Sequence, residues 1–289
     1  MTDVGTAPTT ARRAPIRRDL QLLWRAIKAE NRLFWRTPIG AFFTIGLPLV
    51  MLVLFVALFG NDEIGETRYG NITTAQFYAA SLAVFAAASA TYTNIAINLT
   101  MRRDDGVLKR VRGTPIPPWV FLAGAVFSGV WIAMFSTAVM VGLGVVAYGV
   151  TIDLVQIPAM FVAFVIGTVC FSALGLALAS VAKTASAAPA IANATILPMA
   201  FVSDVFIPLD DPPRWLTLAG DILPLKPFAV AFSQAMSPFT DAPAFEWDRF
   251  AVMAAWTVLG AVVAAKKFRW EPVPGATKGR GRRNRRSAD

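Results

Sequence analysis

The chain has 289 residues, of which 56% are apolar and 16% are charged, and its net charge is +9. Soluble globular domains carry about a quarter of their residues as Asp, Glu, Lys or Arg, so this composition excludes an ordinary soluble enzyme. The absence of histidine and the presence of one cysteine, Cys170, exclude histidine-based metal sites, Ser-His-Asp triads and an internal disulfide.

Six long runs of the sequence contain no Asp, Glu, Lys or Arg. A helix of about 20 apolar residues crosses the hydrocarbon core of a bilayer, which is about 30 Å thick. The runs therefore predict an all-α, polytopic membrane protein with six transmembrane helices in one domain, residues 16–270. The expected spans are residues 39–60, 75–99, 120–148, 157–181, 187–206 and 250–268.

Lysine and arginine are distributed unevenly between the segments that flank these spans. Nearly all of the 27 basic residues lie in alternate segments, counted from the amino terminus. Because basic residues in short flanking segments stay on the cytoplasmic side, we expect both termini in the cytoplasm.

Residues 1–15 and the basic tail, residues 271–289, are expected to be disordered. The tail fits contact with anionic lipid better than nucleic acid binding.

Residues 16–35 form the first predicted helix, which is amphipathic. Leu20 and Trp24 lie on its apolar face, and Arg25 and Lys28 lie on the opposite, basic face. This pattern is typical of an interfacial helix that lies on the inner leaflet. A docking surface for a partner protein is an equal alternative.

Two predicted spans carry amide side chains at membrane depth. Asn94 and Asn98 lie in the cytoplasmic half of the second span, and Asn193 lies in the fifth. Such groups face protein or a wet cavity rather than lipid. They could line a translocation path or join helices through hydrogen bonds, and the sequence leaves both alternatives open.

The segment between the fifth and sixth spans is rich in proline and begins at Asp204. It contains two apolar pieces, residues 215–223 and 228–236, which are too short to cross a bilayer and predict re-entrant or interfacial outer helices. Asp204 lies close to membrane depth, where a carboxylate costs about 3 kcal/mol. Two roles account for it: a place in the substrate path, or a cap at the outer end of the fifth helix.

The sequence contains no Gly-x-x-x-x-Gly-Lys-Ser/Thr phosphate loop, so we expect no ATP hydrolysis by this chain. A concentrated set of catalytic groups is also missing, which disfavours a membrane-embedded transferase. We therefore expect a chain that is not an enzyme and has no cofactor or metal of its own. A stand-alone channel or a membrane scaffold is compatible with these features.

The segment between the second and third spans reads Arg103-Asp-Asp-Gly-Val-Leu-Lys-Arg-Val-Arg-Gly-Thr-Pro-Ile-Pro-Pro-Trp119. It resembles the cytoplasmic loop of type-2 ABC exporter permeases, which has an acidic residue, a glycine, a leucine-basic stretch and a threonine-proline corner. The segment from Val205 to Leu216, with Leu223-Pro-Leu-Lys-Pro-Phe228, resembles the extracellular proline-rich signature of the same family. The two motifs lie on opposite sides of the predicted membrane, and the resemblance covers nearly the whole chain.

The resemblance implies the membrane subunit of an ATP-driven exporter for an amphiphile such as a drug, a lipid or a glycan. ATP and Mg²⁺ would bind to a separate ABC ATPase subunit, and a second permease, identical or different, would complete the transporter in the bacterial cytoplasmic membrane. Asp104 stands where the family usually has glutamate, and Asp204 where glycine is common. The residues implied in ATPase coupling are Glu30, Arg32, Asp104, Gly106, Leu108, Lys109, Arg112, Thr114 and Pro115.

Overall fold

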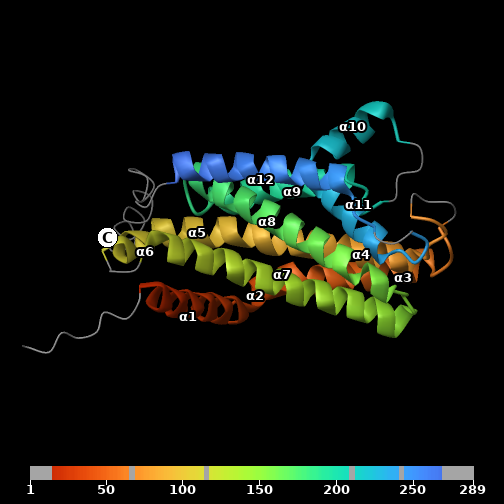
Figure 1. Ribbon diagram of the computed structural model, residues 1–289, viewed down its shortest axis with the longest axis horizontal. Helices are drawn as coiled ribbons and strands as arrows, with labels where there is room; N and C mark the ends of the chain where they lie inside the picture. The colour runs from red at the N-terminus through yellow and green to blue at the C-terminus, as the bar shows by residue number, and fades with distance from the viewer. Residues whose placement is uncertain (1–14, 65–68, 114–116, 208–211, 241–243, 269–289) are drawn as a thin grey trace, which may run out of the picture.

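The computed structural model describes residues 15–64, 69–113, 117–207, 212–240 and 244–268. In these ranges the chain is helical, with one isolated β-bridge between Glu63 and Thr73 and no longer strand. Five helices are long and apolar enough to cross a membrane, or six if a bent helix pair counts as one span. Figure 1 shows that the long helices lie lengthwise beside one another as a bundle. The chain is therefore an all-α, polytopic membrane protein.

The described chain contains twelve α-helices, of which the long apolar ones follow the charge-free runs of the sequence. They are α1 (Pro15–Trp35), α2 (Pro38–Ala41), α3 (Leu47–Phe59), α4 (Thr74–Ala88), α5 (Asn94–Asp104), α6 (Val107–Arg112), α7 (Pro118–Tyr148), α8 (Ile157–Val181), α9 (Ala187–Val202), α10 (Arg214–Ile222), α11 (Leu225–Met236) and α12 (Trp247–Lys267). Two π-helical turns, η1 (Phe42–Gly46) and η2 (Ser89–Thr93), join α2 to α3 and α4 to α5, and a 3₁₀ turn, η3 (Leu154–Gln156), precedes α8.

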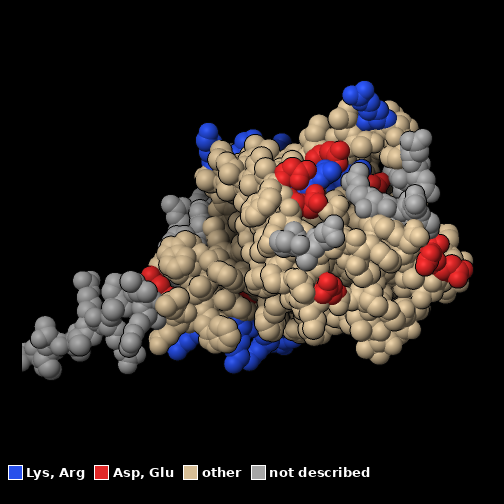
Figure 2. Space-filling model, turned by 45° about the vertical axis from the view of Figure 1, so that its right-hand side comes forward, with Lys and Arg blue, Asp and Glu red and all other residues tan. Residues whose placement is uncertain are grey.

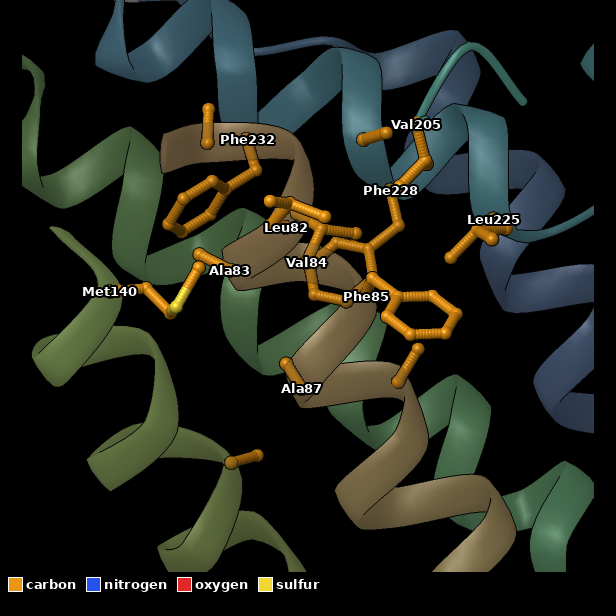
Figure 3. Close-up of a cluster of buried hydrophobic side chains, with 14 of the residues drawn as sticks. Leu82, Ala83, Val84, Phe85, Ala87, Met140, Val205, Leu225, Phe228 and Phe232 are labelled. Carbon is orange, nitrogen blue, oxygen red and sulfur yellow. The ribbon is translucent and has the colours of Figure 1, made fainter. Parts of the chain in front are cut away.

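Helix α4 lies at the centre of the bundle, and all of its side chains are buried. It is rich in alanine, which lets neighbouring helices approach closely, as is usual between membrane helices. Figure 3 shows Leu82 and Phe85 of α4 in a cluster with Met140 of α7 and Phe228 and Phe232 of α11. The core therefore joins helices from the first, middle and last thirds of the chain.

Helix α1 runs alongside α7. A β-carbon on Gly124 of α7 would lie 2.7 Å from the β-carbon of Ala26, so only glycine allows this approach. Further along both helices, the rings of Trp35 and Phe135 make an edge-to-face contact with centroids 5.4 Å apart. The two contacts advance by similar numbers of residues on each helix, so α1 lies lengthwise on α7. A helix that lies on the inner leaflet, as the amphipathic pattern indicates, would instead run across the ends of the spans.

The bundle has two ends, which we call the Gln76 end and the Arg103 end. At the first, the side-chain amide of Gln76 donates hydrogen bonds to the carbonyl oxygens of Thr151 (3.0 Å) and Met236 (2.8 Å). It thereby joins the start of α4 to the α7–α8 connection and to the end of α11. At the other end, Arg103 contacts the end of α8, and Lys267 lines a cavity with it.

The region expected to be re-entrant contains the two short helices α10 and α11, which meet at an angle of 87°. Lys226 at the start of α11 forms an ion pair with Asp204, just after α9, and α11 ends beside Gln76. Helices α10 and α11 therefore stay near the Gln76 end and do not cross the bundle. Figure 1 shows α10 projecting from the side of the bundle near α11 and α12.

Helix α9 ends at Val202, four residues before the expected end of the fifth span at residue 206. The reason is Asp204, whose φ of 57° is in the left-handed region and cannot continue a right-handed helix. The segment from Ala185 to Phe206, which contains α9, nevertheless runs from the Arg103 end of the bundle to the opposite end. The amide of Ala185 bonds Asp104 at the Arg103 end, and the carbonyl of Phe206 accepts a hydrogen bond from the hydroxyl of Tyr78.

Candidate functional site

The segment after α5 forms a sharp reversal and a short helix, α6. Gly106 has a φ of 71°, a conformation that glycine adopts without strain, and it begins α6. Leu108 is fully buried and anchors α6 to the bundle, whereas Lys109 and Arg110 are exposed. This short helix therefore presents a basic surface. Thr114, Pro115 and the side chain of Arg112 lie outside the described residues.

Arg103 connects this segment to the end of α8. Its side chain is 2% exposed, and its guanidinium donates to the carbonyl oxygens of Ala179 (3.0 Å) and Ala182 (2.7 Å). Carbonyls at a helix carboxyl terminus lack partners within the helix and carry partial negative charge, so an arginine there is favourable. The neighbouring Asp104 accepts a hydrogen bond of 2.6 Å from the amide of Ala185. Arg103 and Asp104 thus attach α5 and α6 to the α8–α9 connection.

Glu30 of α1 forms an ion pair with Arg102 of α5. Both carboxylate oxygens accept from the guanidinium, and the Nη2–Oε2 distance is 2.6 Å. The guanidinium carbon of Arg102 also lies 5.5 Å from the ring centroid of Phe121, so the pair joins α1, α5 and α7. Arg32, in contrast, is exposed. Glu30 therefore has a polar partner in α5, whereas Arg32 forms no ion pair with the residues that the structure describes.

A cavity of about 720 Å³ lies between α1, α3, α5, α7 and α9. Asn94, Asn98 and Asn193 line its wall, so side chains of the second and fifth expected spans come together. Asn98 donates to the amide oxygen of Asn94, whereas Asn193 makes no recorded side-chain hydrogen bond among the described residues. Most of the remaining wall is apolar; examples are Leu33, Phe43, Leu47, Phe85, Ile97, Ile132 and Leu197.

Both π-helical turns contribute to this cavity. Phe43 and Thr44 come from η1, and Ser89 and Thr93 come from η2. The hydroxyl of Thr93 is buried without a hydrogen-bond partner among the described residues. Single π-helical turns interrupt the regular backbone hydrogen bonds and often occur at functional sites. The wall therefore offers hydroxyl and amide groups within an apolar surface.

Asp204 lies away from this cavity. Its carboxylate is 3.0 Å from the ammonium of Lys226, whose side chain is 2% exposed, and its Oδ1 atom is buried without a hydrogen-bond partner among the described residues. Of the two roles left open for Asp204, the geometry favours a structural one at the end of α9. The left-handed backbone also explains why glycine suits this position.

The profile of the ABC-2 type transporter family matches residues 21–237, about three quarters of the chain. The chain belongs to this family. It is also similar to the daunorubicin resistance ABC transporter permease protein DrrB1 of Streptomyces coeruleorubidus, with 29% identity over 267 residues, which cover 90% of this chain and 87% of the relative. The chain is therefore the membrane-spanning permease subunit of an ABC transporter.

Within this ABC-2 permease, the residues that the sequence suggested for ATPase coupling and for the substrate path lie in three places. The cavity contains Glu30 and the three asparagines, the surface segment contains Lys109, and the opposite end contains Asp204. Arg102 and Arg103 are the residues that the sequence pattern does not identify, although Arg103 begins the family-like segment and Arg102 directly precedes it. Their partners are 72 to 79 residues away in the chain, so no local pattern identifies them.

Proposed function

We propose that this chain forms the translocation path of an ATP-driven exporter and binds an amphiphilic cargo in the 720 Å³ cavity. The observation that supports this proposal most strongly is the convergence of Asn94, Asn98 and Asn193 on that cavity. Ligand sites are commonly apolar cavities with a few convergent polar groups. The same helix that supplies Asn94 and Asn98 ends at Asp104, and the turn at Gly106 connects it to α6.

The side chains that line this cavity favour a cargo without strong net charge. Glu30 and Arg102 line the cavity but neutralise each other, so the wall offers no free charge among its described residues. A strongly charged cargo would lose its hydration without gaining an ion pair. A mostly apolar molecule with a few hydrogen-bonding groups suits the cavity, and the name of the DrrB1 relative makes daunorubicin a first test cargo.

We further propose that α6 and the preceding turn dock a separate ABC ATPase, which binds ATP and Mg²⁺. Any movement of α6 would reach two walls of the cavity. Arg103 and Asp104 attach it to the α8–α9 connection, and the hydroxyls of Tyr92 and Thr195, 2.7 Å apart, join η2 to α9. An ATPase that binds one arrangement of these helices more tightly than another would shift the population toward it.

The proposed orientation places the Arg103 end in the cytoplasm of a bacterium. Both ends of the described chain support this, because α1 contacts Arg102 and α12 ends in Lys266 and Lys267 at the same end as Arg103. Basic residues at the ends of spans stay on the cytoplasmic side. A second permease would complete the membrane part of the transporter.

Copurification of an ATPase with the tagged chain tests the docking site. Lys109→Glu reverses an exposed charge on α6, and Asp104→Arg and Gly106→Pro disturb the turn before it; all three are expected to lower ATPase recovery about tenfold. Asp62→Arg, an exposed site at the Gln76 end, is the control for charge change. The unfolding temperature of Lys109→Glu should match that of the wild type. Full ATPase recovery with Lys109→Glu and Asp104→Arg would disprove docking at α6.

A further inference from the structure

A second cavity, of about 530 Å³, lies at the Arg103 end between the carboxyl ends of α8 and α12. Its wall includes Lys183, Lys266 and Lys267, together with Val181 and Phe268. Figure 1 shows that α8 and α12 run side by side toward this end, and these two helices have the most extensive contact in the bundle. The proposed cargo cavity contains none of these residues.

The three lysines leave this cavity strongly positive. All three side chains are exposed, and none makes an ion pair within the described ranges. The nearby Arg103 already donates to two carbonyl oxygens, and Asp104 accepts from Arg103 and from the amide of Ala185. An anion that enters the cavity would therefore meet three ammonium groups without displacing a carboxylate of the described residues.

An apolar surface continues from the lysines along α12. Val258, Val262 and Lys266 are spaced by four residues and so share one face, and the two valines are 63% and 43% exposed. On α8, Val181 is 50% exposed beside the same cavity. This combination of a cationic pocket with an exposed aliphatic strip matches a molecule that has an anionic head and a hydrocarbon chain.

We infer that this cavity binds an anionic phospholipid, with the headgroup phosphate held by Lys183, Lys266 and Lys267. The acyl chain would lie along the valine face of α12. Lysine binds phosphate as a point charge and tolerates varied geometry. The bound lipid would bridge the α8–α9 connection to the end of α12, next to Arg103. It would thereby stabilise the surface that supports α5 and α6.

Native mass spectrometry of the purified full-length chain tests this inference, with phosphatidylglycerol and phosphatidylcholine as alternative lipids. The wild type should retain phosphatidylglycerol at least about tenfold more tightly than phosphatidylcholine. A triple Lys183→Gln, Lys266→Gln, Lys267→Gln variant should lose most of that preference, because each surface lysine contributes about fivefold. The corresponding triple arginine variant should keep it.

A matched control removes three exposed basic residues of α1, with Arg18→Gln, Arg25→Gln and Lys28→Gln. Its preference for phosphatidylglycerol should stay within about twofold of the wild type. Equal loss in both triple glutamine variants would show a general charge effect and overturn the site. Displacement of the lipid by inorganic phosphate at equal concentration would also overturn it, because that result would assign the lysines to a free anion.

Discussion

Arg103 is a charged residue that is almost fully buried at one end of a membrane bundle. Its burial is tolerated because the guanidinium donates to two carbonyl oxygens at the end of α8 and lies beside the carboxylate of Asp104. Hydrogen bonds from charged donors are stronger than those between neutral groups. Arg103 therefore fixes the position of α5 and α6 relative to α8.

Removal of Arg103 should destabilise the fold. Arg103→Gln loses two charge-assisted hydrogen bonds, so we expect the free energy of unfolding to fall by about 3 kcal/mol. Arg110→Gln, which removes an exposed charge from α6, should change it by less than about 0.5 kcal/mol. Equilibrium unfolding in mixed detergent micelles measures both values. Equal effects of the two substitutions would contradict the described role of Arg103.

Asp204 and Lys226 allow a test of two opposing effects. Asp204→Gly removes a strained backbone, which stabilises the chain by about 1 kcal/mol, but it leaves the ammonium of Lys226 buried without its partner, which costs about 3 kcal/mol. We expect a net loss of stability. The double change Asp204→Gly with Lys226→Met should recover most of it, because no buried charge remains. If the single change stabilised the protein, the ion pair would be unimportant.

The sequence indicates the cavity residues better than it indicates the ion pairs. Asn94, Asn98 and Asn193 stand out because amides are unusual within apolar runs, and the structure places all three on one cavity. Arg102 and Arg103 do not stand out, since their segment is basic throughout. Only the fold brings Glu30 and the carbonyl of Ala179 to them.

At the scale of elements, the contact between α1 and α7 depends on Gly124. A β-carbon there would lie 2.7 Å from that of Ala26, whereas a β-carbon on Gly142 of the same helix would meet no atom within 4 Å. Gly124→Ala should therefore lower the free energy of unfolding by about 1 to 3 kcal/mol through overpacking. Gly142→Ala should be neutral or stabilising by up to about 1 kcal/mol, since alanine favours helix.

A compensating change provides a further check on this contact. Ala26→Gly in the Gly124→Ala background restores space between the helices and should recover part of the lost stability. Thermal unfolding of the wild type and the three variants in one detergent gives the comparison. No difference between Gly124→Ala and Gly142→Ala would rule out close packing of α1 on α7.

The helical elements are largely predictable because apolar runs of sufficient length have few alternatives in a membrane. The end of α9 is not, because four further residues without a helix breaker follow Val202 in sequence, and the left-handed residue Asp204 has its ion-pair partner, Lys226, 22 residues away. Likewise, the amphipathic pattern of α1 predicts its helix but not its direction along α7, which is seen only from the contacts of Ala26 with Gly124 and of Trp35 with Phe135.

At the scale of the whole molecule, both ends of the described chain lie at the Arg103 end, as an even number of crossings requires. The long helices expose large apolar side chains on their outer faces, and Figure 2 shows a mostly uncharged surface with charged side chains in small groups. Such a surface needs lipid or another membrane subunit around it. The 720 Å³ cavity lies within this bundle, and α6 lies at its Arg103 end.

Transport by the purified permease and its copurified ATPase in proteoliposomes tests the central claim most directly. With α6 facing outward, daunorubicin should accumulate in the vesicles only when ATP is hydrolysed. The double change Asn94→Leu, Asn193→Leu should lower that rate about tenfold, because two hydrogen-bonding groups leave the cavity, whereas Asn71→Leu at the exposed Gln76 end should not. Equal accumulation with and without ATP would contradict the account and indicate a channel.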